Sequence, residues 1–320
     1  MVRELLEVEN LTVEYKAPGV SIRAVNDVSF RLAKGDTLGL VGESGSGKST
    51  LGHAIMRLVD PPGTITGGRI YFADVDLLSL SSEEMRKVRG KRIAMVFQDP
   101  MSSLSPVKNV GDHFVEYIRE HDPNISKDSA LAIAKRIFED LGMDKSRVTD
   151  YPHQFSGGMR QRVMIGLALA LDPLLIVADE PTTALDVVVE AQILELLKAL
   201  KKSYSASMLL ITHNMGVVAE TADRIAVMYA GKLMEVSDTA RLYSRPMNPY
   251  TEALLGSIPN ILLNDQVLKS IPGMPPDMAA LPKGCPFSPR CPYVFDRCRV
   301  EDPPLKPVGD GTETACHLHG

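Results

Sequence analysis

The strongest chemical signal in this 320-residue sequence is a glycine-rich segment that ends in lysine and serine. Residues 42–49 read GESGSGKS and fit the pattern G-x-x-x-x-G-K-[ST], with a strand-like apolar run before them and a helix-like stretch after them. Glycines let main-chain N–H groups approach phosphate oxygens, and the start of a helix adds partial positive charge. The segment therefore predicts a site for the phosphates of a nucleotide. A plain glycine-rich turn is the alternative interpretation.

Individual side chains of this segment have expected roles. Lys48 can place its ammonium group on the β- and γ-phosphates, and the Ser49 hydroxyl can bind Mg²⁺. The residues that we expect to contact the nucleotide are Gly42, Ser44, Gly45, Gly47, Lys48, Ser49 and Thr50.

Two adjacent carboxylates follow the apolar run Leu174–Ala178. If this run is a strand of a parallel sheet, they lie at the sheet edge where ligands bind. We expect Asp179 to hold Mg²⁺, directly or through water, and Glu180 to polarise the water that attacks the γ-phosphate. Adjacent carboxylates at a strand end more often form a solvated turn, so this prediction depends on the lysine motif upstream.

Several other polar segments have ordinary structural interpretations when each is considered alone. Ser156, followed by two glycines, would be a helix N-cap after a loop. Gln98 would be a surface residue after the strand-like run 93–97, and His213 would follow the strand-like run 208–211. Tyr15 would be a core residue of a strand. Their order along the chain changes these interpretations.

Together with the two motifs above, these segments occur in the order found in the ATP-binding subunits of ABC transporters, and the sequence resembles that family over residues 1–245. The resemblance implies an α/β fold: a P-loop NTPase core of the ABC ATPase type with an inserted helical subdomain at about residues 98–170. Residues 246–320 then form a proline-rich C-terminal extension that contains the cysteines.

The resemblance also implies the cofactors and the catalytic residues. ATP is the nucleotide and Mg²⁺ its metal ion, held by Ser49, Gln98 and Asp179. Glu180 acts as the catalytic carboxylate, Gln98 senses Mg²⁺ and the attacking water, and His213 contacts the γ-phosphate.

Other family positions imply a dimer, because they contact a nucleotide bound by the partner subunit. Ser156, Gly157 and Gly158 match the signature segment that reaches the partner's γ-phosphate. Asp186 belongs to the loop that crosses the dimer interface, and Tyr15 is placed where the family stacks an aromatic ring on adenine.

Longer segments resemble one branch of the family, the oligopeptide and dipeptide importers; they are residues 97–106, 151–162 and 245–255. Three positions depart from the branch pattern, which usually has Asn, Thr and His where this chain has Ser105, Val188 and Asn248. None of these removes a group that contacts phosphate. The same branch also imports oligosaccharides or nickel, so the resemblance leaves the transported solute open among these and peptides.

Membership of this branch would bring several partners. They are a second ATPase subunit, identical or related, two transmembrane permeases and, through them, an extracytoplasmic solute-binding protein. The expected location is the cytoplasmic face of the cell membrane. In the expected mechanism, two ATP molecules bound between two subunits favour the closed dimer, and hydrolysis removes that preference.

All four cysteines lie beyond residue 284, in a proline-rich segment; they are Cys285, Cys291, Cys298 and Cys316. Their C-x5-C-x6-C-x17-C spacing fits the usual zinc pattern of closely spaced pairs poorly. The tail resembles the C-terminal extension of peptide-importer ATPases, in which four cysteines hold a 4Fe-4S cluster, and we expect such a cluster in a structural role. Zinc, disulfides or free thiols are the alternatives, and His317 or His319 could replace a cysteine as ligand.

The elements that must position these residues are visible as apolar patterns. Short runs at 37–41, 174–178 and 208–211 alternate with helix-like segments, as in a mainly parallel sheet covered by helices. One helix is expected over Val188–Lys202, with an apolar stripe facing the sheet, and another from near Ser126 to Gly142. Beyond residue 245, where 13 of the 22 prolines lie, long periodic helices disappear, which marks a domain boundary.

Composition excludes several classes of protein. The net charge of −5 provides no broad basic field, so nucleic acid is not an expected partner. The N-terminus is charged from the third residue, unlike a signal peptide, and the longest apolar run, Val163–Leu171, is shorter than the ~20 residues needed to cross a bilayer.

Rival hypotheses are a soluble ABC-type ATPase that acts on a nucleoprotein or ribosome, and a metal or redox sensor with an attached ATPase.

Overall fold

The structure is a computed structural model that describes residues 4–98, 104–183, 185–257 and 271–320. The chain divides into two compact units: one combines the residues up to Leu78 with those from Leu210 onward, and the other contains Ser79–Leu209. Strand β8 (Ser207–Thr212) runs across the boundary between them.

The first unit begins with an antiparallel sheet in the order β2-β1-β4-β5. Its strands are β1 (Glu4–Ala17), β2 (Val20–Ala33), β4 (Gly63–Phe72) and β5 (Val75–Asp76). Apolar residues such as Leu6, Val8 and Val13 are buried along β1, whereas the polar residues between them are partly or fully accessible to solvent. This alternation lets one face of the sheet cover a core while the other meets solvent.

The same unit contains a mixed set of strands, β3 (Thr37–Val41), β9 (Arg224–Tyr229), β10 (Lys232–Asp238), β11 (Lys306–Gly309) and β12 (Thr312–Thr314). β3 pairs in parallel with β9, and β10 pairs antiparallel with both β9 and β12. β3 is buried at every position, as expected of a strand covered on both faces. The β10–β12 pairing joins the end of the chain to a strand formed about 80 residues earlier.

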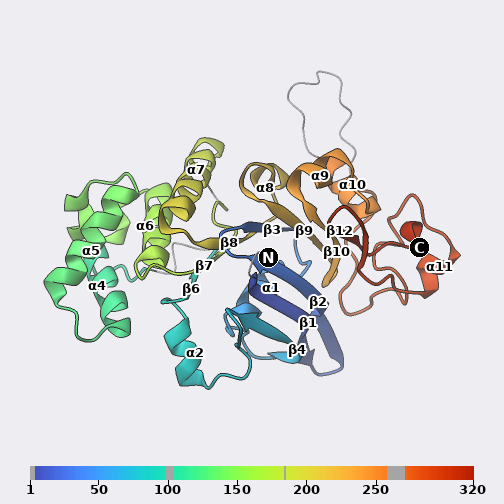
Figure 1. Ribbon diagram of the computed structural model, residues 1–320, viewed down its shortest axis with the longest axis horizontal. Helices are drawn as coiled ribbons and strands as arrows, with labels where there is room; N and C mark the ends of the chain where they lie inside the picture. The colour runs from blue at the N-terminus through green and yellow to red at the C-terminus, as the bar shows by residue number, and fades with distance from the viewer. Residues whose placement is uncertain (1–3, 99–103, 184, 258–270) are drawn as a thin grey trace. The chain divides into compact units, whose positions relative to one another are not determined.

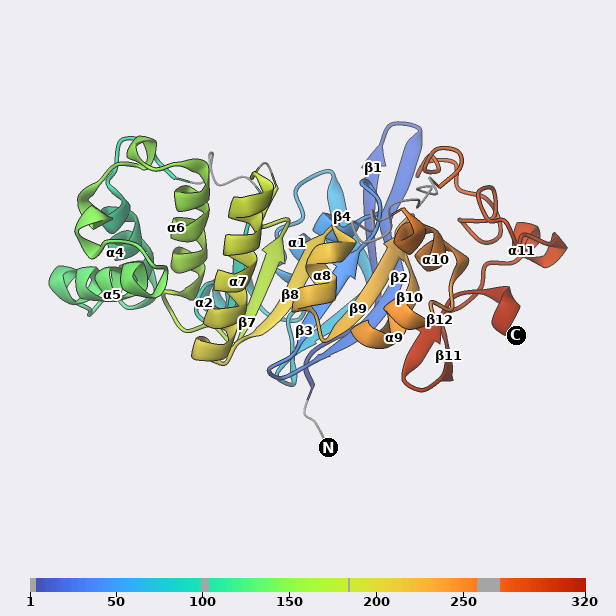
Figure 2. The ribbon, with the colours of Figure 1, turned by 90° about the horizontal axis from the view of Figure 1, so that it is seen from above.

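Short helices complete the first unit; they are α1 (Lys48–Ile55), α8 (Met215–Thr221), α9 (Thr239–Ser244), α10 (Pro249–Gly256), α11 (Asp296–Val300) and the 3₁₀ turn η3 (His317–His319). α9 contacts β9 and β10, and α10 contacts β10 (Figure 2). The segment beyond residue 271 is otherwise built from turns, in keeping with its proline content.

The second unit combines two strands with a group of helices. β6 (Ile93–Val96) pairs in parallel with β7 (Leu175–Asp179). The helical segments are α2 (Ser82–Val88), α4 (Val110–His121), α5 (Lys127–Asp140), η1 (Lys145–Thr149), η2 (Pro152–Gln154), α6 (Gly157–Leu169) and α7 (Val187–Tyr204).

Helices α4, α5 and α6 pack together in the second unit (Figure 1). Phe138 of α5 lies at the centre of their core, with its ring edge-on to Phe114 of α4 at 6.0 Å and to Phe155 at 6.5 Å between centroids. All three rings are nearly inaccessible to solvent. This core holds the start of α6, where the signature segment lies.

The elements expected from apolar patterns are present, with small shifts at their ends. The strand expected at 37–41 is β3 with the same bounds, and the helix expected over Val188–Lys202 is α7. Ser126 is the N-cap of α5, and Gly142 follows its end in the left-handed region (φ 66°). Local patterns therefore placed these elements correctly.

Asn248, one of the departures from the branch pattern, links the start of α10 to the end of the chain. Its Nδ2 donates to the carbonyl oxygens of Met234 (3.0 Å) and Ala315 (3.1 Å) and to Thr314 Oγ1 (3.3 Å). Its Oδ1 accepts a bond from the N–H of Tyr250 (3.0 Å). Asn248 is almost fully buried. Because buried carbonyl oxygens without donors are costly, its amide stabilises the docking of the C-terminal strands on β10.

We expect Asn248→Ala to lower the free energy of unfolding by about 2–4 kcal/mol, since it removes a helix cap and the bond that the side-chain amide donates to the carbonyl oxygen of the buried Ala315. Chemical denaturation checks this value. Asn214→Ala is a matched control, because Asn214 caps α8 in the same unit without reaching another strand, and about 1 kcal/mol is expected there. Equal losses in the two variants would contradict the role given to Asn248.

Candidate functional site

The phosphate-motif lysine closes the loop that precedes its own helix. β3 ends at Val41, the loop follows, and α1 begins at Lys48. Lys48 is only 5% exposed, and its Nζ donates to the carbonyl oxygens of Gly42 and Glu43, both at 2.9 Å. An ammonium group held on the loop in this way is available to an anion that binds over the loop's N–H groups.

Two glycines let this loop lie close to neighbouring strands. Gly42 (φ 154°) and Gly47 (φ 101°) have backbone conformations that favour glycine, and a Cβ on either would lie 2.0 Å from a carbonyl oxygen, that of Met228 or Ala24. No side chain fits at either position. The loop is also bonded to the turn between β9 and β10, where the Gly231 N–H donates to the Ser46 carbonyl oxygen (2.9 Å).

The other nucleotide residues predicted in the first unit occupy accessible positions. Ser44 and Gly45 are exposed at the tip of the loop, and Ser49 and Thr50 are half-buried in the first turn of α1. Tyr15 is half-buried on β1 opposite Gly63 of β4. Its stacking on adenine stays a prediction.

In the second unit, Glu180 directly follows β7 and is held by two neighbours. Gln98 Nε2 donates to Glu180 Oε2 (3.1 Å), and Thr183 Oγ1 donates to the same oxygen (2.7 Å). Glu180 has a left-handed backbone (φ 44°), which is unusual for a side chain of this kind. Asp179, the last residue of β7, is 3% exposed. The structure thus brings together two of the predicted catalytic residues.

Thr183 was not singled out in the sequence. The only available signal was a hydroxyl three residues after Glu180, the predicted catalytic carboxylate, and threonines at turns are common. Its bond to Glu180 depends on the turn that follows β7, in which the Thr183 N–H donates to the Glu180 carbonyl oxygen (3.2 Å).

The signature segment and the loop before α7 both form helix N-termini. Ser156 caps α6 by accepting a bond from the Met159 N–H (3.4 Å), and Gly157 and Gly158 form its first turn. Asp186 caps α7 by accepting from the N–H groups of residues 188 and 189 (3.1 and 3.0 Å). Ser156 and Gly157 are exposed, so an outside phosphate can reach them.

The predicted residues are divided between the units. Tyr15, the phosphate loop and His213 belong to the first unit, and Gln98, Asp179, Glu180, Ser156 and Asp186 belong to the second. His213 is exposed directly after β8. Ala184 and residues 99–103 of the predicted segments lie outside the described residues.

The four cysteines of the extension line one small cavity, together with Phe287, Pro249 and His317. None of the four forms a disulfide in the structure. Burial raises the pKa of Cys285 to about 11, and burial also raises the pKa values of Cys291 and Cys316. Within the described part of the chain, no three His, Cys, Asp or Glu side chains are arranged to hold a metal ion.

Both histidines considered as alternative ligands have backbone partners. His317 Nε2 lies 2.9 Å from the carbonyl oxygen of Glu301, and His319 Nε2 lies 2.7 Å from that of Met247. A ring nitrogen that donates to a carbonyl cannot bind a metal with the same atom. The cysteines are therefore the better candidates for ligands.

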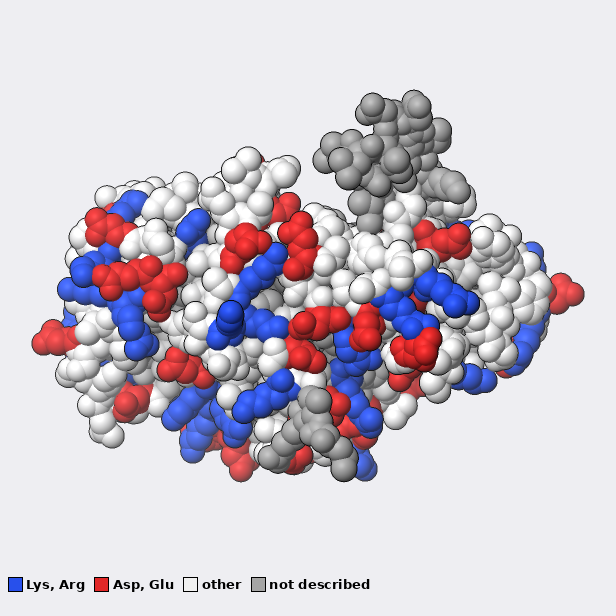
Figure 3. Space-filling view, turned by 45° about the horizontal axis from the view of Figure 1, so that its top comes forward, with Lys and Arg blue, Asp and Glu red and all other residues white. Residues whose placement is uncertain are grey.

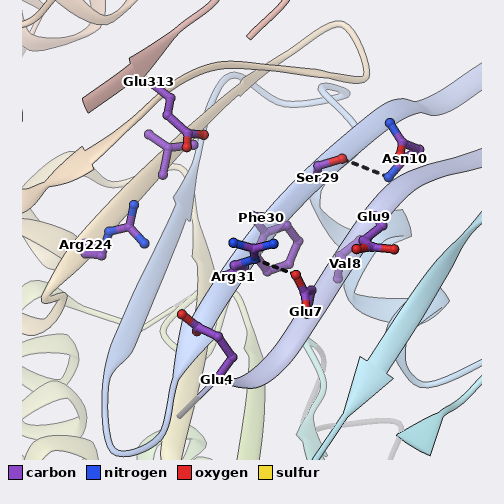
Figure 4. Close-up of a pocket in the computed structure, with 11 residues that line it drawn as sticks. Glu4, Glu7, Val8, Glu9, Asn10, Ser29, Phe30, Arg31, Arg224 and Glu313 are labelled. Carbon is purple, nitrogen blue, oxygen red and sulfur yellow. Dashed lines mark hydrogen bonds and ion pairs between the residues drawn. The ribbon is translucent and has the colours of Figure 1, made fainter. Parts of the chain in front are cut away.

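A larger cavity, of about 570 Å³, lies among β1, β2, β9, β10 and β12 (Figure 4). Charged and polar side chains of both signs line it, including Glu4, Glu7, Arg31, Arg224 and Glu313, and Arg31 is paired with Glu7. None of its lining residues belongs to a phosphate motif. Ligand pockets are mostly apolar with few polar groups, so this cavity is a poor candidate for the functional site.

The surface gives two further observations. On the face shown in Figure 3, acidic and basic side chains are interspersed, and neither sign forms a large patch. No helix in the described ranges has both the length and the apolar character needed to cross a bilayer.

Comparisons with known proteins agree with these motifs. The family described as "ABC transporter" matches residues 25–183, and that described as "Oligopeptide/dipeptide transporter, C-terminal region" matches residues 234–298. The chain is 47% identical over 313 residues to the oligopeptide transport ATP-binding protein OppD of Bacillus subtilis, covering 97% of this chain and 87% of that protein.

Two other similarities extend this result. The dipeptide transport ATP-binding protein DppD of Escherichia coli is 43% identical over 315 residues, covering 98% of this chain and 96% of that protein. Among solved structures, a dimeric ATP-binding cassette in a post-hydrolysis state with bound ADP and Pi is similar, with a TM-score of 0.66 and 28% identity. That likeness covers 73% of this chain and 98% of the solved chain.

The raised pKa of Cys285 predicts an unusual pH dependence of alkylation in reduced, metal-free protein. Only the thiolate reacts, so with a pKa of about 11 the rate with iodoacetamide should still rise between pH 9 and pH 10.5. A cysteine in a short peptide, with a pKa of about 8.5, levels off in that range. Mass spectrometry of the Cys285 peptide measures the rate, and a plateau near pH 9 would contradict the prediction.

Proposed function

The chain belongs to the ATP-binding subunits of ABC transporters, in their oligopeptide and dipeptide branch, and we propose that it hydrolyses ATP to drive the import of short peptides. The observation that carries this proposal is the buried Lys48 closing a glycine-rich loop at the start of α1, in a chain that matches such subunits over nearly its whole length. ATP hydrolysis follows from the family, and the cargo from the names of the relatives.

The loop of the first unit would bind the ATP phosphates. Its N–H groups and the start of α1 attract the anion, and Lys48 adds a full charge to the β- and γ-phosphates. Ser44 and Gly45 are exposed at the loop tip, where the phosphates approach, and Tyr15 would contact adenine.

Hydrolysis would depend on Glu180. Gln98 and Thr183 donate to its carboxylate and fix its direction, so that the other oxygen can accept a proton from the attacking water. We propose that His213 contacts the γ-phosphate. Ser49, Gln98 and Asp179 offer hydroxyl, amide and carboxylate oxygens, the ligand types that suit Mg²⁺, and the ion would neutralise charge on the phosphates.

The signature residues would act on a nucleotide held by a second subunit, identical or related. Ser156 and Gly157 are exposed at the start of α6, where N–H groups and the helix dipole attract phosphate. Gly158 lies in the same turn, and Asp186 caps the neighbouring α7. Two nucleotides shared in this way favour the closed dimer until hydrolysis.

The remaining partners are proposed from the branch. They are two transmembrane permeases, which would hold this subunit at the cytoplasmic face of the membrane, and a solute-binding protein that delivers cargo to them. Peptides are the proposed cargo because the named relatives transport oligopeptides and dipeptides. Oligosaccharides or nickel are the alternatives within the branch.

We also propose that Cys285, Cys291, Cys298 and Cys316 hold a 4Fe-4S cluster in a structural role, with zinc as the alternative. The four thiols line one cavity, which suits a shared group. A zinc ion needs its ligands at about 2.3 Å from one point. In the described residues no three candidate ligands meet in that way. The preference for a cluster, whose thiolates bind different iron atoms, rests on the resemblance of the tail to peptide-importer ATPases.

The ATPase roles are tested with Glu180→Gln and Lys48→Ala. Glu180→Gln should bind MgATP with near-normal affinity and hydrolyse it about 10²–10⁴-fold more slowly, because the general base is lost. Lys48→Ala should bind MgATP much more weakly, because the charge on the phosphates is lost. Nucleotide affinity and phosphate release are measured on both variants. Near-normal turnover by Glu180→Gln would refute the role of Glu180.

The metal proposal is tested by elemental analysis of protein purified without oxygen. Four iron atoms and matching sulfide per chain are expected, and Cys298→Ser should lower the iron content. His317→Gln is a matched control that should keep its iron, because the ring nitrogen faces a backbone carbonyl. One zinc per chain would favour the alternative, and no metal at all would contradict both.

A further inference from the structure

Arg290, in the C-terminal extension, reaches a residue of the phosphate loop. Its Nη1 and Nη2 donate to Glu43 Oε2 and Oε1, at 2.6 and 3.0 Å, in a bidentate ion pair. The Arg290 side chain is 5% exposed and that of Glu43 is 23% exposed. The two residues are 247 positions apart in the sequence. Paired guanidinium and carboxylate groups in this geometry are both strong and directional.

Other bonds fix Arg290 in this position. Its Nε donates to the carbonyl oxygen of Pro272 (2.9 Å), and its Nη1 also donates to the Tyr229 hydroxyl (3.2 Å). The guanidinium carbon lies 5.9 Å from the centre of the Tyr229 ring. The arginine is therefore held from several sides and cannot turn away without losing buried hydrogen bonds.

Glu43 is held at its main chain as well as its carboxylate. Its N–H donates to the Tyr250 hydroxyl (2.9 Å), and its carbonyl oxygen accepts from Lys48 Nζ (2.9 Å). The residue thus connects the motif lysine to two parts of the extension, α10 and the segment that carries Arg290. Any movement of Glu43 would move the first part of the loop.

Three aromatic rings support these contacts. Tyr229, Tyr250 and Phe287 lie 4.5, 5.4 and 5.2 Å apart between pairs of centroids. Each is almost fully buried. Phe287 comes from the extension, so its side chain and that of Arg290 approach the loop from the same short segment. The extension packs on the nucleotide-binding core at the phosphate loop.

We propose that Arg290 is a positioning residue of the nucleotide site, which holds the phosphate loop through Glu43 and neutralises that carboxylate so that the loop can accept a nucleotide polyphosphate. The inference rests on the proposed function of the loop. It makes the C-terminal extension part of the nucleotide-binding machinery. Arg290 itself need not touch the nucleotide.

The reason is electrostatic. A carboxylate in a loop that binds phosphates repels its ligand unless a cation offsets it, and a half-buried charge is poorly screened by salt. Removal of one partner from a buried ion pair leaves the other charge uncompensated. Lysine would replace arginine poorly, because a single ammonium cannot make the bidentate contact.

The segment that carries Arg290 lies between two of the cysteines that line the cavity. The Ser288 N–H donates to the Cys285 carbonyl oxygen (3.0 Å), and the Arg290 N–H donates to that of Phe287 (2.9 Å). Cys291 follows Arg290 directly. The two turns between the first two cysteines therefore set where the guanidinium points.

The test measures the affinity of the full-length chain for a fluorescent ADP analogue with magnesium. Arg290→Met should weaken binding on the order of 10-fold, because the Glu43 carboxylate is left without its cation. The double variant Glu43→Gln with Arg290→Met should recover binding to within about 3-fold of the unaltered protein, since both charges are gone. A purely structural role for Arg290 would give no such recovery.

Lys232→Met is the matched control. Lys232 of β10 pairs with Asp302, so it also ties the extension to the core but does not touch the loop. Its removal should leave nucleotide affinity unchanged. Melting temperatures of all variants are compared. If Arg290→Met does not fold, Arg290→Lys is used instead. It keeps the charge, and its affinity for the analogue should be lower than that of the unaltered protein by about 3-fold or more.

The inference is overturned if folded Arg290→Met binds the analogue with unchanged affinity. If Arg290→Met does not fold, unchanged affinity in Arg290→Lys overturns it. Equal losses in Arg290→Met and the double variant would also overturn it, as would an equal loss in Lys232→Met. A failure of the unaltered protein to bind the analogue would instead contradict the proposed function, so the two failures are distinguishable.

Discussion

The proposed binding of phosphates depends on a loop that must present positive charge while its own backbone stays ordered. Lys48 is nearly buried and donates to the carbonyl oxygens of Gly42 and Glu43, so the loop holds its own cation in place. Gly42 and Gly47 bring the same loop against carbonyl oxygens of neighbouring strands. A site prepared in this way loses little entropy when an anion arrives. The surrounding structure maintains that preparation.

The C-terminal extension takes part in this support. β12 pairs with β10, Asn248 bonds to main-chain atoms near the end of the chain, and Arg290 reaches Glu43. These contacts join residues that are far apart in the sequence to strand β10 and to the glycine-rich loop. An appendage linked only by a flexible connection would lack them. The extension is thus packed on the core of its unit, whatever group its cysteines hold.

The second unit uses a different means to orient Glu180, the proposed general base. Glu180 follows a fully buried strand and has a left-handed backbone, and its carboxylate accepts bonds from Gln98 and Thr183. Strain of this kind persists only where the surroundings enforce it. The buried β7 on one side and the turn to Thr183 on the other provide that constraint. The signature helix α6 is fixed separately, by the aromatic core around Phe138.

Much of the fold of this protein can be predicted from local sequence patterns. The α/β fold class with a P-loop core is confirmed, as are the family and the elements β3, α5 and α7, because apolar periodicity and cap residues act over a few positions. The nucleotide and cysteine assignments remain predictions that rest on motifs. Only the tertiary structure revealed the roles of Thr183, Asn248 and Arg290. Thr183 meets Glu180 because of the turn that follows β7. The partners of Asn248 and Arg290 are chosen by packing between distant segments, and a lone arginine or asparagine in a sequence carries no sign of which carboxylate or carbonyl it will meet.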